Sequence, residues 1–534
     1  METYNVLVVD DDEDIRAKAL QTHSGDNRLC VTVAKDIAEA RAAINCQFFH
    51  VAFVDMQLDP STRQTDGKTV LRELADLRPS CTRVLLTQYP DVYRKDFFDL
   101  THPLYPIVAG SVDKLNPRED FTEVMLRMSE SWCTRTVAVD GVPIIHKQLH
   151  MKVRHGAKVD VTGDEVDFIV SRLLGQGGSA DGISNDDVSR ITLEPLHGGR
   201  SRSVVAMGTP IAGDGTNGIL CVVKLGPRSD TAEEQTRYDR YVRFLVSLNR
   251  RVELLGYVLG DTVGGVCYSF AGRSPDAIRS LGDLFSQERA EAINVLRSLF
   301  AKDRREWYLR TGKGSDLTNY FHRAYGLDAR DVLENARDFA ERIASDLGLR
   351  KRRDEIQFDG GRLRIPHDIL GSGSMRASYP SCIVHGDMNA ENVICADDDR
   401  VMCIDYRYTG WGPRTLDFAA LQTSIRLAPP AVVRGLPQQL GDLRHERSVW
   451  DEGWSEDAID DGKCNDAAVL PFWAQVSREL LLLARANFDG LTQQEHAATC
   501  LLWALRVFRV KDLSQAAKLR LLVWMSWLND VLSR

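Results

Sequence analysis

Short apolar runs that alternate with helical stretches constrain the fold of the first 125 residues or so. The runs NVLVVD, HVAFVD and TRVLLT end at Asp10, Asp55 and Thr87 and consist mainly of β-branched residues and leucine. Such continuous runs are typical of strands buried on both faces of a parallel sheet. The intervening segments IRAKAL and DIAEARAAI carry apolar residues at helical spacing. The alternation predicts an α/β domain with a doubly wound, five-stranded parallel sheet.

The residues that end these strands are chemically informative, because ligands bind at the carboxyl ends of the strands in such sheets. Asp10 and Asp11 close the first run, Asp55 closes a later one, Thr87 ends TRVLLT, and Lys114 follows PIVAGSVDK. Three carboxylates, a hydroxyl and an ammonium are thus expected at one edge. Mg²⁺ would offset the clustered negative charge, and Asp55 could then attack a phosphoryl donor.

This segment resembles the receiver domain of two-component response regulators through VLVVDDDEDIR, AFVDMQL, DGKTVLREL, LLTQYPD and SVDK. The resemblance implies that Asp10 and Asp11 bind the metal together with Asp55, which is also the phosphoacceptor. It further implies that Thr87 is the switch hydroxyl and that Lys114 contacts the phosphoryl group. A sensor histidine kinase is the implied phosphoryl donor.

The sequence departs from the receiver pattern in three places. Ser111 stands where an aromatic switch residue is usual, Leu115 replaces the proline that usually follows the lysine, and about four extra residues separate Asp55 from Gly67. The alternative interpretation is that the acids are solvated strand-end and turn residues, which any domain of this architecture could carry.

A second group of polar residues lies near position 400. In HGDMNAEN, Asp387 precedes Asn392 by five residues, and Asp405 follows in VMCIDY. A short loop, a hairpin and a second loop would bring the three together as a carboxylate base, an amide ligand and a carboxylate ligand. Phosphoryl transfer requires such a set, with Mg²⁺ held beside the nucleotide and a group that orients or deprotonates the acceptor.

These residues resemble the catalytic and metal-binding loops of protein kinases, and most closely those of the aminoglycoside phosphotransferase and choline kinase branch. The resemblance lies in HGD, in IDY and in GPRTLDFAAL. It implies that Asp387 is the catalytic base and that Asn392 and Asp405 hold Mg²⁺. Structural roles are implied for His385 and Asp417, and ATP is the implied phosphoryl donor.

The upstream strands ITLEPL, RSVVAM and GILCVVKL, between Ile191 and Leu225, predict an antiparallel meander that forms the small lobe. Lys224 is placed to contact the α and β phosphates of ATP, with Glu234 on the following helix as its partner and Glu233 as the alternative. The turn LHGGRSRSVV lacks GxGxxG, yet the backbone amides of Gly198 and Gly199 could cover the phosphates. A plain hairpin turn is the alternative.

The Gly/Asp-rich segment GQGGSADGISNDD predicts a linker before the meander. From Ser286 onward helices are expected to dominate, apart from the β-rich segment Cys382 to Tyr406, and the acidic DEGWSEDAIDDGK is expected to be an exposed insertion. The predicted domains are a receiver over 1–128, a linker over 129–188, a kinase-like N-lobe over 189–272 and a helical C-lobe over 273–534.

Composition excludes several classes of function. The 67 basic and 76 acidic residues give a net charge of −9, so nucleic acid is not an expected partner. The eleven cysteines include no CxxC pair, which argues against a zinc site or a disulfide framework. No run of 18 apolar residues occurs, so no membrane association is expected. We expect a cytoplasmic protein with reduced thiols.

The leading hypothesis is a two-component signalling protein whose receiver regulates an ATP-dependent phosphotransferase, through a two-state arrangement of the lobes or of a homodimer. The acceptor, a small molecule or a protein, is unknown. One alternative is a pseudokinase-like scaffold that binds nucleotide without chemistry. Another is a DNA-binding response regulator, which the acidic charge and the missing helix-turn-helix disfavour.

Overall fold

The structure of the 534-residue chain is a computed structural model. It divides into two compact units, Met1–Gln235 with Glu253–Phe270, and Thr236–Val252 with Ala271–Arg534. The residues that the structure describes are 4–25, 29–58, 66–88, 110–114, 138–153, 160–175, 188–196, 202–247, 250–272, 278–300, 305–346, 348–352, 355–358, 361–364, 370, 375, 377–396, 400–429, 436–454 and 470–533.

The first sheet of unit 1 consists of five parallel strands in the order β2-β1-β3-β4-β5. The central strand β3 is buried throughout, as its continuous apolar run predicted. The strand order reverses beside β1, which is the topology of a doubly wound sheet, so the predicted fold of this domain is confirmed. The strands are β1 (Tyr4–Val9), β2 (Leu29–Ala34), β3 (Val51–Asp55), β4 (Thr82–Thr87) and β5 (Gly110–Asp113).

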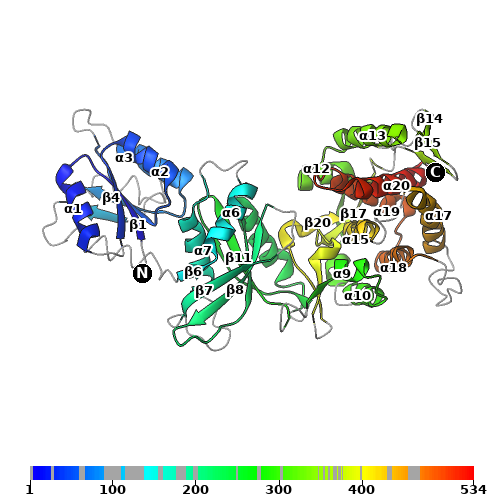
Figure 1. Ribbon diagram of the computed structural model, residues 1–534, viewed down its shortest axis with the longest axis horizontal. Helices are drawn as coiled ribbons and strands as arrows, with labels where there is room; N and C mark the ends of the chain where they lie inside the picture. Colours follow the sequence, from blue (N-terminus) through cyan, green and yellow to red (C-terminus); the bar gives the residue numbers. More distant parts are fainter. Residues whose placement is uncertain are drawn as a thin grey trace. The chain divides into compact units, whose positions relative to one another are not determined.

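Helices cover both faces of this sheet (Figure 1). Helices α2 (Ile37–Cys46) and α3 (Asp66–Leu77) bury their apolar side chains against one face, and α1 (Glu13–Gly25) packs on the other. Asp36 caps α2 by accepting a hydrogen bond from the amide of Glu39 at 2.9 Å, as short polar side chains do at helix starts. The two apolar layers hold the polar strand ends in register at one edge.

A six-stranded sheet forms the rest of unit 1, in the order β10-β11-β9-β8-β7-β6. Its neighbours pair antiparallel, except for β6 and β7, which run parallel. The predicted meander is therefore confirmed as β7, β8 and β9. The strands are β6 (Ala138–Asp140), β7 (Val188–Pro195), β8 (Val204–Ala212), β9 (Cys221–Pro227), β10 (Leu254–Leu259) and β11 (Val263–Ser269).

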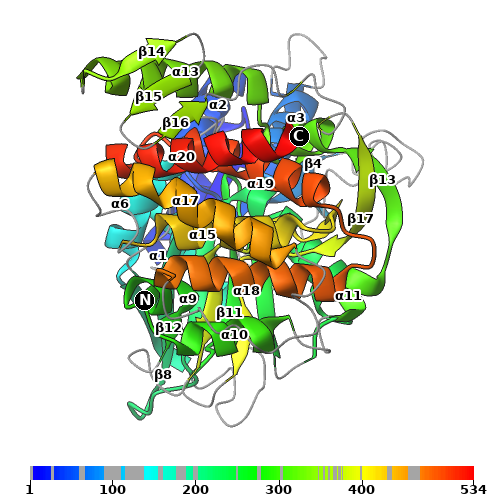
Figure 2. The same ribbon diagram turned by 90° about the vertical axis from the view of Figure 1, so that its right-hand side faces the viewer.

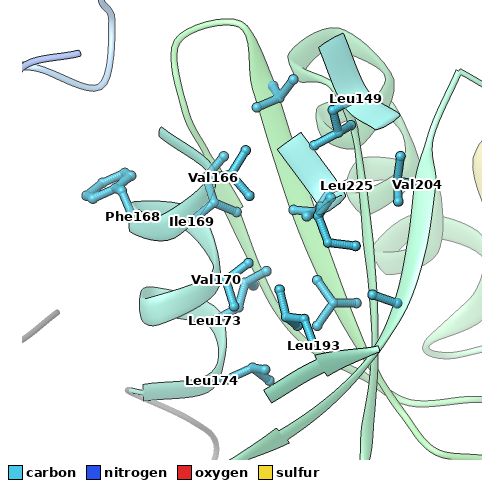
Figure 3. Close-up of a cluster of buried hydrophobic side chains, with 14 of the residues drawn as sticks. Leu149, Val166, Phe168, Ile169, Val170, Leu173, Leu174, Leu193, Val204 and Leu225 are labelled. Carbon is cyan, nitrogen blue, oxygen red and sulfur yellow. The ribbon is translucent and has the colours of Figure 1, made fainter. Parts of the chain in front are cut away.

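The segment predicted as a linker, 129–188, supplies part of this lobe. It contains β6 and the helices α6 (Val142–Val153) and α7 (Gly163–Gly175). The apolar side chains of both helices face those of the strands in one buried cluster (Figure 3). The prediction of a linker rested on the Gly/Asp-rich segment that follows α7. It missed the two helices before that segment, which bury apolar residues at helical spacing.

The helix expected after Lys224 is α8, Arg228–Arg237, and a π-helical turn, Tyr238–Val242, follows it. Ser229 is therefore the second residue of this helix. Tyr238 is buried, and its hydroxyl donates to the Val252 carbonyl at 2.8 Å.

Unit 2 contains three small antiparallel sheets, with the orders β12-β18-β19, β13-β17-β20 and β14-β15-β16. More β structure therefore occurs here than the single predicted segment. The additional strands are two to five residues long, too short to leave a clear alternation in the sequence. The strands are β12 (Arg279–Ser280), β13 (Gly312–Asp316), β14 (Arg350–Arg352), β15 (Glu355–Phe358), β16 (Gly361–Arg364), β17 (Ser378–Val384), β18 (Val393–Cys395), β19 (Val401–Cys403) and β20 (Gly410–Pro413).

Helices dominate the remainder of unit 2, and α15, α17, α18, α19 and α20 lie side by side (Figure 2). Their interior includes the fully buried Trp450, Trp503 and Trp524. The helices are α9 (Leu281–Ser286), α10 (Glu291–Leu299), α11 (Arg305–Leu309), α12 (Leu317–Tyr325), α13 (Ala329–Asp346), α15 (Leu416–Leu427), α17 (Leu436–Gly453), α18 (Phe472–Asn487), α19 (Gln493–Phe508) and α20 (Gln515–Leu532).

The bundle also buries an ionic network. Glu446 of α17 accepts hydrogen bonds from Arg426 at 2.6 and 2.8 Å and from Arg520 at 3.1 Å, and all three side chains are fully buried. The acidic insertion predicted after α17 lies largely outside the described residues. Among the helices in the described part of the chain, none is both long and apolar enough to cross a bilayer.

Candidate functional site

Three carboxylates meet at the carboxyl edge of the receiver-like sheet. Asp10 and Asp11 directly follow β1, Asp55 is the last residue of β3, and ligand oxygens of the three lie within 4.8 Å of one another. The neighbouring parallel strands end at the same edge, which is why residues 45 positions apart converge. Burial raises the pKa of Asp10 to about 6, and it raises the pKa of Asp55 as well.

Lys114 is the cation of this cluster. Its Nζ lies 2.5 Å from Asp10 Oδ2 and 2.9 Å from Asp55 Oδ2. Burial alone would lower the pKa of Lys114, but the two paired carboxylates raise it above its ordinary value. The Lys114 backbone amide donates to the Thr87 carbonyl at 3.0 Å, so β4 positions the lysine.

The cluster fits a divalent cation. It holds three carboxylates and one ammonium, so negative charge is in excess. Mg²⁺ suits such a site because it prefers oxygen ligands and would offset that charge. Two of the carboxylates are already oriented, since Oδ1 of Asp10 accepts from the Asp12 amide at 2.9 Å and Oδ1 of Asp55 accepts from the Met56 amide at 2.7 Å. Asp10, Asp11 and Asp55 would hold the ion.

Two neighbouring positions lie close to Asp55. Thr87 is buried at the end of β4, one residue beyond Leu86, which pairs with Asp55 across the sheet. Gly67, near the start of α3, approaches the same aspartate closely, and a Cβ there would lie only 1.9 Å from the Asp55 carbonyl oxygen. Ser111, at the usual aromatic switch position, is exposed.

The six-stranded sheet carries a buried ion pair between β9 and α8. Lys224 Nζ lies 2.7 Å from Glu234 Oε2, with side chains 11% and 3% exposed. Tyr268 of β11 donates its hydroxyl to the other oxygen, Oε1, at 2.7 Å. Glu234, rather than Glu233, is thus the partner of the lysine. Tyr268 belongs to the same arrangement, although no sequence motif points to it. The proposed phosphate-covering turn with Gly198 and Gly199 lies outside the described residues.

The second group of polar residues follows β17 in unit 2. Asn392 ends a 3-10 turn, Ala390–Asn392. Its side-chain amide donates a hydrogen bond to the Asp387 backbone carbonyl at 2.8 Å. The amide of Ile404 donates to the Asn392 carbonyl at 3.0 Å, which ties the loop of Asp405 to the same turn. Asp405 has a φ of 65°, and this left-handed conformation is uncommon outside glycine and often marks functional loops.

Asp417 is hydrogen-bonded to the backbone of the loop that carries Asp387. Its carboxylate accepts from the backbone amides of His385 at 2.9 Å and Gly386 at 3.0 Å, and from the Tyr308 hydroxyl at 3.1 Å. Complete burial raises the pKa of Asp417 in spite of these donors. Gly386 requires its glycine, because it has a φ of 81° and a Cβ would lie 2.3 Å from the Tyr408 carbonyl oxygen.

His385 contributes to this support through its ring. The Nε2 atom lies 3.0 Å from the Ile404 carbonyl, and the ring also contacts Tyr406 at a centroid distance of 5.3 Å. The histidine thus connects the loop of Asp387 with the loop of Asp405. The oxygen atoms of Asn392 and Asp405 are the ligands in these loops that suit Mg²⁺.

One interaction in this region is not predictable from the sequence motifs. Arg506 of α19 donates Nη1 to Asp387 Oδ1 at 2.8 Å, and each of the two side chains is 16% exposed. The two residues are 119 positions apart, and Arg506 stands in a helical segment that matches no motif.

Comparisons with known proteins place two different likenesses on this chain. A family model described as ternary complex associated domain 9 matches residues 190–330. No curated protein matches the chain. A CheY-like receiver domain protein from Methanospirillum hungatei is 21% identical over 24% of this chain and 94% of its own, with a TM-score of 0.21.

Two further solved structures are similar over a larger share of the chain. An aminoglycoside phosphotransferase from Streptomyces rimosus is 18% identical over 55% of this chain and 92% of its own, with a TM-score of 0.25. A choline kinase from Streptococcus pneumoniae is 10% identical over 63% and 94%, with a TM-score of 0.32. The likeness to a receiver domain thus covers a smaller share of the chain than the likenesses to an aminoglycoside phosphotransferase and a choline kinase.

Proposed function

We propose that the protein is an ATP-dependent phosphotransferase whose activity is controlled by phosphorylation of its receiver. The observation that carries the proposal is the loop of Asp387, which Asp417 holds through two backbone amides. The side chain of Asn392 is bonded to this loop, and the backbone of Asn392 is bonded to Ile404, the residue before Asp405. In this proposal Asp387 accepts the proton of the acceptor hydroxyl, and Asn392 and Asp405 hold Mg²⁺.

Lys224 supplies a cation for the α and β phosphates of ATP. Its ion pair with Glu234, at 2.7 Å, fixes the lysine in the middle of β9, and the hydroxyl of Tyr268 holds the other oxygen of the glutamate. A lysine that is positioned in this way loses little conformational freedom on binding phosphate, so the pair supports nucleotide binding.

The receiver side of the proposal rests on Asp55. A phosphoryl group on this residue adds a charge of about −1.5 to −2 at neutral pH, beside Lys114 and the proposed Mg²⁺ site. A sensor histidine kinase is the proposed donor, and the cytoplasm is the proposed location. Phosphorylation of Asp55 would change the activity through a two-state rearrangement of the lobes or of a homodimer.

A physical link between receiver and N-lobe supports this control. Asp261, in the turn between β10 and β11, accepts from Arg78 at 3.4 Å and from Ser80 at 2.5 and 3.0 Å. Arg78 and Ser80 lie between α3 and β4 of the receiver, and the Arg78 and Asp261 side chains are fully buried. A buried, charged contact of this kind resists small displacements.

The same turn connects to the lysine. Glu165 of α7 accepts hydrogen bonds from Thr262 at 2.7 Å and from the Val263 amide at 3.1 Å. Strand β11 begins at Val263 and pairs Val266 with Lys224 in register. A shift of the turn would therefore be transmitted along β11 to the residue that faces Lys224 and to Tyr268.

Apolar contacts add to this interface. Phe48 of the receiver belongs to the buried cluster of the N-lobe and contacts Phe168 of α7 at a centroid distance of 5.2 Å. His50 contacts the same phenylalanine at 5.7 Å. The receiver and the N-lobe thus share a core in unit 1, which favours coupling between them.

A pseudokinase-like scaffold is the second candidate, and one observation favours it. The carboxylate proposed as the base is paired with Arg506 at 2.8 Å, which would hinder proton acceptance if both oxygens were engaged. Only Oδ1 of Asp387 takes part in that pair, and Oδ2 remains to accept a proton. We therefore favour the enzyme.

The experiment that tests the proposal compares γ-phosphate release and transfer from labelled Mg·ATP by the full chain and by Asp387→Asn. The matched control is Asp328→Asn, an exposed aspartate of the same unit. Turnover should fall by at least about 100-fold in Asp387→Asn and persist in the control. Tight nucleotide binding without turnover in the wild type would favour the scaffold.

A further inference from the structure

The surroundings of Asp387 contain a fixed cation that bears on the choice of acceptor. Besides its 2.8 Å contact with Asp387, the guanidinium of Arg506 stacks on Trp503 at 4.3 Å, on Tyr325 at 4.4 Å and on Tyr408 at 5.4 Å from each ring centroid. Burial alone would lower the pKa of Arg506, but its pairing with Asp387 raises that pKa above its ordinary value. The arginine is therefore permanently charged.

The aromatic side chains that hold Arg506 are themselves fixed. The Tyr325 hydroxyl donates to the Gly386 carbonyl at 2.6 Å, and the Tyr325 ring contacts Tyr408 at 5.1 Å and Trp503 at 5.7 Å. Because three rings and a carboxylate enclose the guanidinium, it is a preorganised part of the site.

A second cation lies close to the first. Arg509, the C-cap residue of α19 and three positions after Arg506, donates to the Tyr325 carbonyl at 2.5 Å and to the Gly326 carbonyl at 2.7 Å. Arg506 stacks on the ring of Tyr325 while Arg509 binds the backbone of the same residue, and the like charge of Arg506 adds to desolvation in lowering the pKa of Arg509. Unlike Arg506, Arg509 is exposed, so its charge is available to a ligand.

We infer that the acceptor is an anionic hydroxyl compound, one that carries a carboxylate or phosphate beside the hydroxyl that receives the phosphoryl group. This inference rests on the proposed function and deepens it. The Asp387 carboxylate is already paired with Arg506, whereas Arg509 donates to two backbone carbonyls beside the same tyrosine and forms no ion pair among the described residues. A cationic acceptor would be repelled by Arg509, whereas an anionic one would pair with Arg509 beside the already paired Arg506.

The chemical step follows from this arrangement. The acceptor hydroxyl oxygen forms a bond to the γ phosphorus of ATP while the bond from that phosphorus to the bridging β–γ oxygen breaks and ADP leaves. The hydroxyl proton passes to Oδ2 of Asp387, because Oδ1 is held by Arg506. The arginines bind and orient the acceptor and take no proton.

Calorimetric binding to the full chain tests the inference independently of turnover. The anionic probes are glycerate, which carries a carboxylate, and glycerol 3-phosphate, which carries a phosphate. Neutral glycerol and cationic choline are the comparison compounds, and each compound is measured with and without Mg·ADP. The expected result is binding of at least one anionic probe, at least about tenfold tighter than either glycerol or choline.

Variants connect the preference to the named residues. Arg509→Gln and Arg506→Gln should each weaken binding of the anionic probe by about 10- to 100-fold, and Arg506→Lys should restore part of the affinity. Arg330→Gln, which removes an exposed arginine at the start of α13, should leave it unchanged. Thermal melting of every variant shows that it is folded.

Each other outcome overturns the inference. These outcomes are preferential binding of choline, no binding of either anionic probe, and an anion preference that survives in both glutamine variants. Failure of the proposed function has a different signature, since ATP turnover would be absent, or unaffected in Asp387→Asn, while the anion preference persisted.

Discussion

Replacing Asp261 by asparagine should destabilise unit 1 and weaken the link between the receiver and the N-lobe. The amide has nearly the shape of the carboxylate and can still accept a hydrogen bond from Ser80, so the change removes mainly charge. Arg78 would then be a fully buried cation whose remaining acceptors are the neutral backbone carbonyls of Ile44, at 2.8 Å, and Asn45, at 3.4 Å. Removing one partner of a buried ion pair lowers the free energy of unfolding by about 3–5 kcal/mol. Because the contact with Ser80 is retained, we expect a loss of about 3 kcal/mol.

A double-mutant cycle separates the pair from general damage. Burial raises the pKa of Asp261, which means that the ionised carboxylate is costly to bury and that the pair as a whole adds little net stability. Arg78→Met combined with Asp261→Asn should therefore be less destabilising than the sum of the single changes, by about 1–3 kcal/mol. Urea unfolding of the full chain measures these free energies.

The control is Asp140→Asn, which removes the aspartate of an exposed ion pair with Arg190 in the same unit. Exposed pairs of this kind add little to stability, so its unfolding midpoint should stay close to that of the wild type. The reasoning is refuted if Asp261→Asn is as mild as the control, or if the effects of Arg78→Met and Asp261→Asn simply add.

Three further predictions concern stability and loop support. His50 is buried, its Nδ1 accepts a backbone amide of β1 at 2.9 Å, and burial lowers its pKa to about 4. A depressed histidine pKa stabilises the fold above pH 6.5, and this contribution, up to about 3 kcal/mol, is lost as pH falls from about 6.5 to 4. Unfolding of His50→Gln should therefore depend less steeply on pH over that interval. Glu446→Gln removes the carboxylate that pairs with the buried Arg426 and Arg520, so urea unfolding should show a loss of about 3–5 kcal/mol. Asp417→Asn removes one of two carboxylate oxygens that accept loop amides, and it should lower the free energy of unfolding by about 1–3 kcal/mol and ATP turnover by more than tenfold.

Each of these expectations has a contradicting result. If the free energy of unfolding of His50→Gln depended on pH as steeply as that of the wild type, the histidine would not remain neutral in the folded protein through the acidic range. A mild effect of Glu446→Gln, comparable with that of an exposed change such as Asp451→Asn, would show that the two arginines find other partners. Full turnover in Asp417→Asn would show that the loop of Asp387 does not depend on this anchor.

The receiver-like domain was predictable because its signals are local. Each buried strand is a continuous apolar run. In a parallel sheet, the residue at the carboxyl end of each strand lies at the edge where ligands bind. Once the strand order is known, Asp10, Asp55 and Thr87 must therefore come together. The HGD and IDY segments are similarly local, since Asp387 and Asn392 are only five residues apart and the hairpin to Asp405 is short.

The features that sequence reasoning missed depend on contacts between distant segments. The linker prediction failed at α6 and α7 because their apolar residues reveal a core only when the sheet they cover is known. Arg506 lacks any motif, and its role comes from packing against Tyr325 and Trp503. Asp261 reads as an ordinary turn residue, because nothing in its neighbourhood in the sequence indicates that Arg78 is its partner.

The most direct test of receiver control is the rate of γ-phosphate release from Mg·ATP by the full chain, before and after beryllofluoride caps Asp55. A coupling of about 1–3 kcal/mol corresponds to a rate change of about 5- to 150-fold. The account predicts a change of this size in the wild type and none in Asp55→Ala, which cannot be capped. Equal rates with Asp55 free and capped, with capping verified by fluorine NMR, would contradict it.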